Sequence, residues 1–344
     1  MSGEIVLAVD GGNYKTDLAL VRPDGNVLAL VRGPQSSPQH LGVEGCLRVL
    51  EDLLEQALDD ARLPNGRKPV ASVGQLLLAG VDFQAEEEEL YAAAAPRGLA
   101  ERISVANDTF AVLRAGTEKG WGVAVVCGAG INCVGVGPDG RHARFPALGP
   151  ITGDWGGGHD VGLAGLSAAA RSEDGRGPRT SLERAVPAHF GLDTPAAVGE
   201  AIHRGEIADS RVLELAPVVL AEAGEDAVAA SILDRLAEEM VALARVALAR
   251  LELTAAPVEV LLGGGLTRSG DGRLIRAVED RLQEVAPAAT VHATSSPPIV
   301  GAALLGLDEL EASAEAQSRL RREIGDLVAR IEGGRKEARS WNDA

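Results

Sequence analysis

EIVLAVDGGNYKTDLALVRPDGNVLALV, residues 4–31, is the stretch that decides the fold. Its three apolar runs are short and rich in β-branched and aliphatic residues, as strands are. Gly11 and Gly12 separate the first two runs, and Pro23-Asp24-Gly25 separates the last two. Proline fixes φ and Asp-Gly tolerates a positive φ, so the second break is a tight turn. The stretch therefore predicts a three-stranded β-meander whose first turn is rich in glycine.

The same layout returns about a hundred residues later. Residues 122–127, GVAVVC, run into Gly128-Ala129-Gly130, resume as INCVGV, turn at Pro138-Asp139-Gly140 and resume as RHARF. The two Pro-Asp-Gly turns are offset by 115 residues. This repetition predicts an internal duplication, with the chance recurrence of a common turn as the alternative.

Helical and strand patterns alternate in the rest of the chain. Leu47, Leu50, Leu54, Leu58 and Ala61 share one face of a helix. The further segments, in chain order, are a strand at 72–81, an acidic helix from Ala85, a strand at 103–107, a helix from Asp108, mostly helix from 162 to about 252, a strand within 258–265, and helices at 295–307 and 320–331. Strands that alternate with helices predict an α/β fold with some parallel strand pairing.

The length of 344 residues suggests about two domains. We expect them at residues 1–117 and 118–310, followed by an amphipathic helix and tail at 311–344. The helix at 296–310 belongs in sequence to the second domain and could also pack on the first. The C-terminal helix could pack within the chain or pair with a partner, and the sequence leaves both open.

The composition argues against several classes of function. The chain holds 33 Lys and Arg against 50 Asp and Glu, a net charge of −17, which leaves no basic stripe for nucleic acid. The N-terminus lacks the basic segment of a secretory signal, and no apolar stretch reaches the ~20 residues that span a bilayer. The three cysteines form no CxxC pair. We expect a cytoplasmic, reduced protein that binds neither nucleic acid nor membrane.

The first glycine turn is a candidate phosphate site. It reads Gly11-Gly12-Asn13-Tyr14-Lys15-Thr16. Glycines let backbone N–H groups approach an anion, and Lys15 and Thr16 add donors. Asp10, at the strand end, could hold Mg²⁺ through water, since hard cations prefer oxygen ligands. The alternative is an ordinary glycine hairpin with an exposed aspartate.

Two later glycine segments have related interpretations. Gly128-Ala129-Gly130, followed by Asn132, is the equivalent turn of the second copy, and two such turns facing each other would grip a polyphosphate from both sides. Gly263-Gly264-Gly265 follows a buried strand and would permit the close approach of a flat ligand such as adenine. A plain strand-to-helix turn explains the triplet nearly as well.

Asp108 follows the strand ISVAN and opens a helix. As a general base it would accept a hydroxyl proton beside the phosphates. Alternatively, Asn107 or Asp108 caps the helix. Asp154, within Thr152-Gly153-Asp154-Trp155-Gly156, precedes another helix and has the same two interpretations.

The order of these motifs resembles the actin-like ATPase superfamily and, within it, the N-acetylglucosamine kinase-like members of the BadF/BadG/BcrA/BcrD ATPases. The motifs are the DGGxxKT turn, the strand-end aspartate, the GxGxNC turn, the GDxG segment and the late GGG, over about residues 4–310. The resemblance implies two duplicated, ribonuclease H-like domains that flank a cleft. ATP, Mg²⁺ and a sugar would bind there, in a protein that is commonly a homodimer.

The same resemblance implies roles for individual residues. Asp108 matches the base that deprotonates the sugar hydroxyl, normally the 6-OH. The two glycine turns match the phosphate loops, and Gly263-Gly264-Gly265 matches the adenosine segment. The residues on the expected sugar side are Ser36, Ser37, Gln39, His40, Asp82, Asn107, Asp108 and Asp154.

Two departures from the family pattern leave the sugar open. The family segment often reads GDEGS, whereas Trp155 and Gly157 stand here in place of Glu and Ser, and the loop that usually offers an Asn reads PQSSPQH. We expect an ATP-dependent kinase of N-acetylglucosamine first and glucosamine second. One alternative is an activator ATPase of a 2-hydroxyacyl-CoA dehydratase or benzoyl-CoA reductase system, whose iron–sulfur cluster needs cysteine ligands. The other is a catalytically silent sugar or nucleotide sensor.

Overall fold

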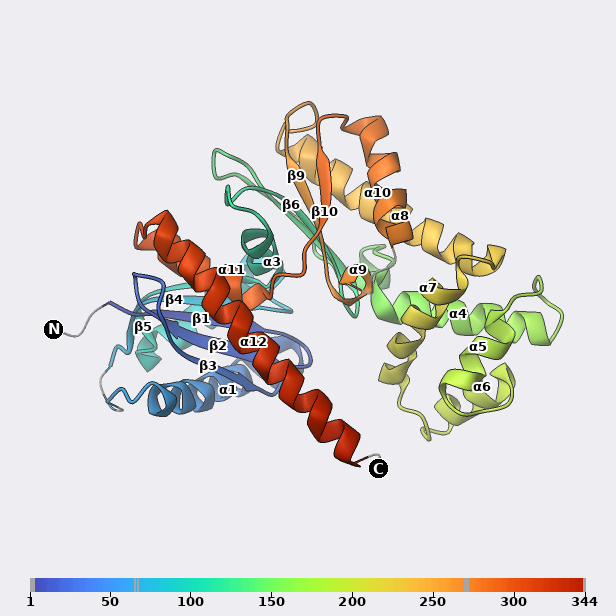
Figure 1. The fold of residues 1–344 in the computed structure, drawn as a ribbon, viewed down its shortest axis with the longest axis horizontal. Helices are drawn as coiled ribbons and strands as arrows, with labels where there is room; N and C mark the ends of the chain where they lie inside the picture. Colours follow the sequence, from blue (N-terminus) through green and yellow to red (C-terminus); the bar gives the residue numbers. More distant parts are fainter. Residues whose placement is uncertain (1–3, 65, 67, 269–271, 343–344) are drawn as a thin grey trace. The chain divides into compact units, whose positions relative to one another are not determined.

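The computed structural model describes residues 4–64, 66, 68–268 and 272–342. Contacts between residues divide the chain into two compact units (Figure 1). Unit 1 comprises Met1–Gly120 and Ser296–Ala344, and unit 2 comprises Trp121–Ser295. The chain therefore leaves unit 1 once, forms the whole of unit 2, and returns to unit 1 for its last two helices.

Unit 1 is built on a five-stranded mixed sheet in the order β3-β2-β1-β4-β5. The first three strands form the predicted antiparallel meander, whereas β1, β4 and β5 run parallel. The strands are β1 Val6–Gly11, β2 Thr16–Val21, β3 Val27–Gly33, β4 Ala71–Leu78 and β5 Ala100–Asn107. Gly25 of the Pro-Asp-Gly turn has a φ of 82°, as the turn chemistry predicts.

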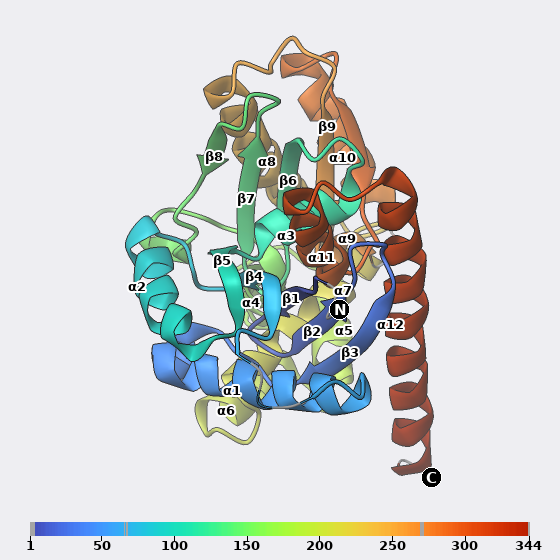
Figure 2. The same ribbon diagram turned by 90° about the vertical axis from the view of Figure 1, so that its left-hand side faces the viewer.

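Helices cover both faces of this sheet (Figure 2). Alternate strand residues point to opposite faces, so Leu7 and Val9 join the core beneath α1 and α2, while Val6 and Ala8 join the core with α3, α11 and α12. The helices of unit 1 are α1 Pro38–Asp60, α2 Gln84–Ala94, α3 Thr109–Gly116, α11 Pro298–Glu309 and α12 Ala314–Asn342, with the 3₁₀ turn η1 Ala95–Arg97.

The last two helices complete the second face of the unit 1 sheet. α11 packs on α3 and β1, and Gly301 permits this approach because a Cβ there would clash with the Ala111 carbonyl. On α12, Leu320 and Ile324 of the predicted apolar stripe are fully buried in the same core. Of the two placements left open for residues 296–310, contacts therefore support packing on the first domain. The physical reason is that α3 has only eight residues and cannot cover this face alone.

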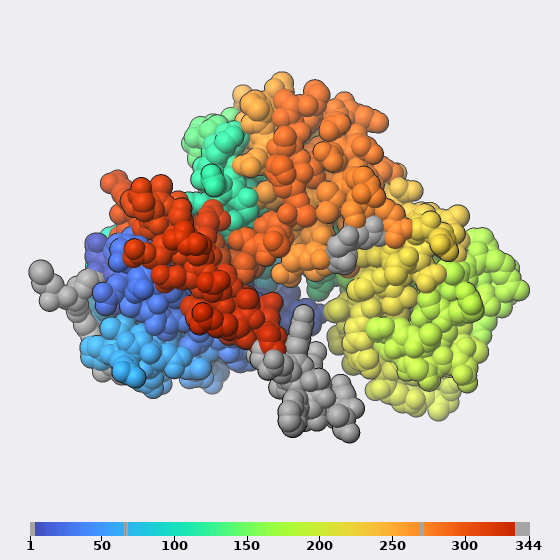
Figure 3. Space-filling model, viewed as in Figure 1, coloured from blue at the N-terminus to red at the C-terminus, as the bar shows by residue number. Residues whose placement is uncertain are grey.

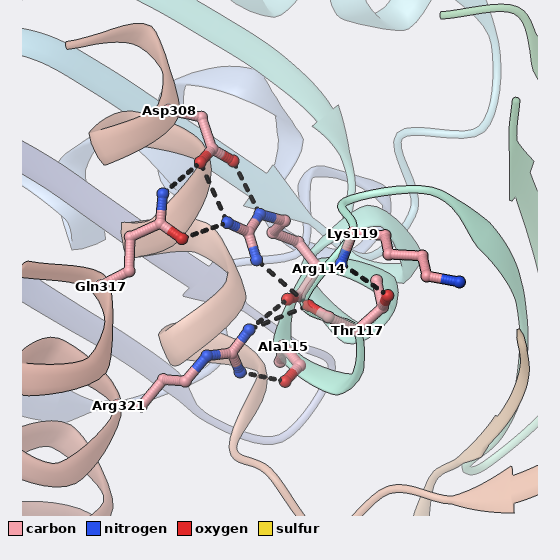
Figure 4. Close-up of polar contacts among 7 residues, drawn as sticks. All are labelled: Arg114, Ala115, Thr117, Lys119, Asp308, Gln317 and Arg321. Atoms are coloured by element: carbon pink, nitrogen blue, oxygen red, sulfur yellow. Dashed lines mark hydrogen bonds and ion pairs between the residues drawn. The ribbon is translucent and has the colours of Figure 1, made fainter. Parts of the chain in front are cut away.

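Two arginines fasten α12 to the segment at which the chain leaves unit 1 (Figure 4). Arg114 of α3, which is 4% exposed, donates to the Asp308 carboxylate of α11 at 2.7 and 3.0 Å. Arg321 of α12 donates to the carbonyl oxygens of Thr117 at 2.9 Å and Ala115 at 2.5 Å. These carbonyls lie at the C-terminal end of α3, where a helix leaves acceptors without intrahelical partners. The arginines therefore fix the end of α3 just before the chain enters unit 2.

Unit 2 repeats the sheet of unit 1, in the order β10-β9-β6-β7-β8. Its first three strands are antiparallel, whereas β6, β9 and β10 run parallel. The strands are β6 Gly122–Cys127, β7 Ile131–Val136, β8 His142–Arg144, β9 Glu259–Gly263 and β10 Thr290–Ala293. Strands β6 to β10 thus take the places and directions of β1 to β5. The predicted duplication is confirmed.

Most of the other residues of unit 2 are helical. The helices α4 to α7 gather in one helical lobe (Figures 1 and 3), in which α4 contacts each of the other three. The helices are α4 Gly157–Glu173, α5 Leu182–His189, α6 Pro195–His203, α7 Ala216–Glu222, α8 Ala227–Arg250, α9 Gly265–Arg268 and α10 Gly272–Val285, with the 3₁₀ segments η2 Gly149–Ile151 and η3 Asp209–Leu215. Within the residues that the structure describes, no helix is long and apolar enough to cross a bilayer.

Candidate functional site

The carboxyl ends of three parallel strands meet at one edge of the unit 1 sheet. In register, Gly11 of β1 pairs with Leu78 of β4, and Leu78 pairs with Asn107 of β5. Asp10 directly precedes Gly11, and Asp108 directly follows Asn107. In α/β sheets, ligands bind outside such carboxyl ends. This edge therefore gathers the predicted metal-binding carboxylate and the predicted base.

Asp10 is a buried carboxylate whose neighbours only partly offset its charge. Its cross-strand neighbour Asp17 is fully buried and is held by Arg32 of β3, whose Nε and Nη2 donate to it at 2.5 and 2.9 Å. Lys15 also pairs with Asp17. Burial raises the pKa of Asp10 from 3.8 to about 7; Lys15 lowers it in part, and repulsion from Asp17 and Asp108 adds to it. A bound cation would favour the ionised carboxylate and so lower the pKa of Asp10.

The first glycine turn is a tight connection between β1 and β2. The Gly12 N–H donates to the Lys15 carbonyl at 2.9 Å, which closes the turn. Asn13 and Tyr14 form its exposed tip, and the Tyr14 side chain is 65% exposed. The tip is therefore open to solvent, as a phosphate-binding turn needs to be.

Ser36 and Ser37 lie in the interior beside this turn. Thr16 Oγ1 donates to Ser36 Oγ at 2.8 Å, and a Cβ on Gly11 would clash with the same hydroxyl. Both serines are fully buried, and Ser37 Oγ has no hydrogen-bond partner among the described residues. Ser36 thus supports the turn, while Ser37 keeps a buried hydroxyl that a ligand or water would satisfy.

Asp108 stands at the start of α3 without capping it. The side-chain oxygen of Asn107 takes that role, because it accepts from the Thr109 backbone N–H at 3.0 Å and from the Thr109 hydroxyl at 2.6 Å. The Asp108 side chain makes no capping hydrogen bond. Burial raises the pKa of Asp108 to about 6, against the opposing effect of the backbone N–H groups of Thr109 and Asp108. Of the two capping alternatives, Asn107 is the one observed, and Asp108 remains available for chemistry.

A row of hydrogen bonds joins three of the residues predicted on the sugar side. Asn107 Nδ2 donates to Asp82 Oδ1 at 2.8 Å, and Gln39 Nε2 donates to Asp82 Oδ2 at 3.4 Å. Gly80 has a φ of 79°, and a Cβ there would press on the Gln39 amide. His40 is exposed beside Gln39 at the start of α1. The fold thus brings together side chains from α1, the end of β4 and the end of β5.

Three glycine segments that are far apart in sequence pack together in unit 2. The Gly158 N–H donates to the Gly128 carbonyl at 2.7 Å, so the start of α4 rests on the second glycine turn. Gly157 has a φ of 80° and presses on Gly130, where a Cβ would clash. Gly264 has a φ of 99° and lies against the backbone at the end of β6. The contacts of Gly157 and Gly264 require glycine, because a side chain at either position would clash with the neighbouring backbone.

The turn between β6 and β7 is open on one side. The Gly128 N–H donates to the Gly130 carbonyl at 2.9 Å, and the Ala129 carbonyl accepts from His159 at 3.0 Å. No described atom lies within 4 Å of the place that a Cβ on Gly128 or Gly130 would take. Asn132 is partly buried on β7. The space beside the two glycines is what a phosphate cradle requires.

The remaining predicted residues of unit 2 are Gly263, Gly265 and Asp154. Gly263 ends β9 in register with Val126 of β6, and Gly265 begins α9. Asp154 is partly buried and contacts the Thr152 hydroxyl. The triplet of glycines therefore lies beside the strand that leads into the second glycine turn.

Asp17 and Arg32 belong to the unit 1 site although no sequence motif points to them. They occupy matching positions on neighbouring strands, with Asp10 opposite Asp17 and Asp17 opposite Arg32. The signal was present in the hairpin register, since Asp10 and Asp17 stand symmetrically about the glycine turn. Arg32 neutralises Asp17 and so leaves Asp10 as the less compensated carboxylate of the pair.

The donor set bears on which metals the chain could hold. Within the described part of the chain, no group of three or more His, Cys, Asp or Glu side chains could hold a metal ion. A single strand-end carboxylate suits Mg²⁺, which keeps several waters and phosphate oxygens as ligands. The three cysteines are buried free thiols, and burial raises the pKa of Cys46 and Cys127 to about 12 and that of Cys133 as well. Such thiols are poor cluster ligands, because ligation needs the thiolate.

Comparison with known proteins relates the chain to kinases of amino sugars. It is 29% identical over 214 residues to the N-acetylmuramic acid/N-acetylglucosamine kinase of Clostridium acetobutylicum, which covers 62% of this chain and 69% of that protein. It is 32% identical over 197 residues to the N-acetyl-D-glucosamine kinase of Dictyostelium discoideum, over 54% of this chain and 60% of that one. The match thus spans about three fifths of the Dictyostelium kinase.

A solved structure extends the likeness to the whole fold. The crystal structure of a Chromobacterium violaceum protein, provisionally assigned as an N-acetylglucosamine kinase, superimposes with a TM-score of 0.70 at 27% identity. The match covers 89% of this chain and 100% of that one. Together with the repeated sheets, this confirms the predicted α/β fold class of two duplicated domains. The sequence model of the BadF/BadG/BcrA/BcrD ATPase family matches residues 7–306, and the chain therefore belongs to that family.

Proposed function

We propose that this protein is an ATP-dependent sugar kinase that transfers the γ-phosphoryl group to the 6-hydroxyl of an amino sugar, N-acetylglucosamine before glucosamine. The observation that carries this is the edge of the unit 1 sheet, where two carboxylates with raised pKa values, Asp10 and Asp108, stand at the ends of parallel strands beside a glycine turn. Membership of an ATPase family and kinase relatives support the same conclusion.

Asp108 has the properties of a general base. With a pKa of about 6 it is mostly ionised at neutral pH and is more basic than an ordinary aspartate. Asn107 caps α3, so the Asp108 carboxylate is free to accept a hydrogen bond from the sugar hydroxyl. Accepting that proton orients the attacking oxygen, and positioning accounts for most of the catalysis of phosphoryl transfer.

Asp10 is the proposed ligand of the Mg²⁺ ion that accompanies ATP. Mg²⁺, when bound there with ATP, neutralises charge on the phosphate oxygens. The carboxylate of Asp10 would hold it through water, and the pKa of about 7 would fall on binding because a cation favours the charged form. Lys15, which is paired with Asp17, is the cationic side chain of the adjoining turn and would be a further donor to phosphate.

The glycine segments are assigned to the nucleotide. The turn at Gly11–Thr16 in unit 1 and the turn at Gly128–Asn132 in unit 2 would each bind phosphate oxygens of ATP, and Gly263–Gly265 would lie beside the adenosine. Tight backbone turns suit this task because their N–H groups can point at an anion with no side chain between. In support, each of these segments is held in place by a contact that only glycine permits.

The polar row next to Asp108 is assigned to the sugar. Gln39, Asp82 and Asn107 offer amide donors and carboxylate acceptors that match hydroxyl groups, and they are already ordered by their mutual hydrogen bonds. Preordered groups lose less freedom on binding. Ser37, His40 and Asp154 are further candidates. The names of the relatives direct the choice of substrate to N-acetylglucosamine.

A panel of sugars incubated with ATP and Mg²⁺ tests this function. The readouts are the release of ADP and the position of the new phosphate on the sugar. Asp108→Asn should lower kcat by about 10²–10⁴-fold and change ATP affinity little. Asp60→Asn, an exposed carboxylate at the end of α1, is the matched control and should have no effect. Near-normal phosphorylation by Asp108→Asn would show that the base is elsewhere.

The same panel separates the alternative functions. Wild type that binds ATP but releases no ADP with any sugar would instead indicate a sensor. Iron and sulfide in the purified protein would indicate the activator class. Sedimentation of the same samples tests the expected homodimer.

A further inference from the structure

Unit 2 contains a hollow of about 470 Å³ between α4 and the first half of α8. Its lining includes the apolar side chains of Leu163 and Ile232, the indole of Trp155 and the guanidinium groups of Arg171 and Arg235. The volume lies in the range of ~300–1,000 Å³ that small-molecule sites occupy. None of these five residues has a part in the proposed ATP or sugar contacts.

Arg235 is held in one orientation by Trp155. Its guanidinium carbon lies 3.9 Å from the centre of the Trp155 ring. The indole ring attracts the guanidinium cation in this position, and the guanidinium carries five N–H donors. Among the described residues, Arg235 forms no ion pair and no hydrogen bond. The side chain is thus preorganised and its donors are unused.

The second arginine of the hollow also forms no salt bridge with a described residue. Arg171 donates one N–H to the Arg176 carbonyl at 2.9 Å and forms no salt bridge with a described acid, although its charge acts on Asp174. Asp160 lines the hollow too, but its carboxylate accepts from the Gly156 N–H at 2.9 Å at the start of α4.

This arrangement stands out against the overall charge of the chain. Its 50 acidic residues outnumber its 33 basic ones, and Arg281, which packs on the same helix α8, is paired with Asp234. Two arginines that form no salt bridge with a described acid therefore line one hollow in an acidic protein.

We propose that this hollow binds a small acid of monosaccharide size. Its carboxylate or phosphate would be held by Arg171 and Arg235, and its carbon skeleton would lie against Leu163 and Ile232. A planar guanidinium fork matches the paired oxygens of either acid, and such charge-assisted bonds are stronger than neutral ones. Trp155 directly follows Asp154, so the bound acid would lie next to the segment assigned to the sugar. This site goes beyond the kinase activity and does not depend on it.

Calorimetric titration of the full-length protein without ATP tests the site. The probes are N-acetylmuramic acid for the carboxylate, N-acetylglucosamine 6-phosphate for the phosphate, and neutral N-acetylglucosamine. Arg235→Met should weaken the binding of at least one acid about tenfold or more, since it removes charged hydrogen bonds. It should leave the binding of the neutral sugar unchanged. Arg245→Met, an exposed arginine on the same helix outside the hollow, should affect neither.

The two acid probes show which kind of acid the hollow takes. Equal affinity of wild type and Arg235→Met for both acids would overturn the proposal, as would the absence of binding of either acid to wild type. An equal loss in Arg245→Met would overturn it as well, because the effect would then come from net charge. Arg235-dependent binding in a protein that phosphorylates no sugar would reject the kinase and keep this site.

Discussion

Replacing Asp10 by Asn should stabilise the ligand-free protein, and the gain should grow with pH. Burial raises the pKa of Asp10 in the folded state from 3.8 to about 7. The unfolded chain loses this proton first, so between about pH 4 and 7 the folded protein holds one proton more than the unfolded chain. The stability that wild type has below about pH 4 is therefore lost as the pH rises through about 7. Asn carries no charge and escapes this loss.

The raised pKa sets the size of the effect. The interval from 3.8 to about 7 corresponds to about 4 kcal/mol, at ~1.4 kcal/mol for each pH unit. Asp10→Asn should thus gain up to about 4 kcal/mol in the free energy of unfolding between pH 4 and pH 8, relative to wild type. The same variant should lose kinase activity, because the carboxylate proposed to sit beside the metal is gone.

Hydrogen exchange of the β1 and β2 amides measures this stability within unit 1. Comparing the two proteins at the same pH removes the intrinsic dependence of exchange on pH. Asp60→Asn, whose carboxylate is exposed, should show no such trend. Equal protection of wild type and Asp10→Asn at pH 8 would refute the inference that Asp10 is buried and ionised there.

Three further experiments test the role of Asp108, the backbone contact of Gly264 and the bonds from Arg321 to the end of α3. The kcat/KM of wild type should rise with pH through about 6 as Asp108 ionises, and the pH profile of Asp108→Asn should lack this limb. Gly264→Ala should lower the free energy of unfolding by about 1–3 kcal/mol, because a φ of 99° strains any other residue, and Gly265→Ala, at an open position, should be neutral in thermal unfolding. Arg321→Met should cost about 1–3 kcal/mol in denaturant unfolding, because the Ala115 carbonyl loses its arginine donor and the Thr117 carbonyl keeps only the bond from Arg114. Arg319→Met, which breaks a surface ion pair, should cost less than about 1 kcal/mol.

Local sequence patterns were enough to predict much of the architecture. The glycine turn, the Pro-Asp-Gly turn and the short apolar runs predicted a meander that the structure contains twice. The same patterns placed Asp10 and Asp108 at strand ends. They succeeded because turn chemistry and strand periodicity depend on residues that are neighbours in the chain.

Contacts across the sheet were harder to predict in this way, although Asp10 and Asp17 stand symmetrically about the glycine turn. The pairing of Asp10 with Asp17, and of Asp17 with Arg32, depends on strand register. The choice of Asn107 as the helix cap, and its bond to Asp82, depends on how β4 and β5 end side by side. Burial raises the pKa values of both carboxylates, and the charge of Asp17 raises the pKa of Asp10 further. Burial depends on the whole fold, so motif spacing could not predict these pKa values.

The sequence by itself determined the repeated strand-and-turn units and the identity of the strand-end acids. These features depend only on stretches of a few consecutive residues. Only the tertiary structure decided that residues 296–342 return to cover unit 1, and that three glycine segments pack together in unit 2. The reason is that apolar burial and backbone approach are satisfied by whichever surfaces the completed fold leaves open, and these are set by contacts between residues a hundred or more positions apart.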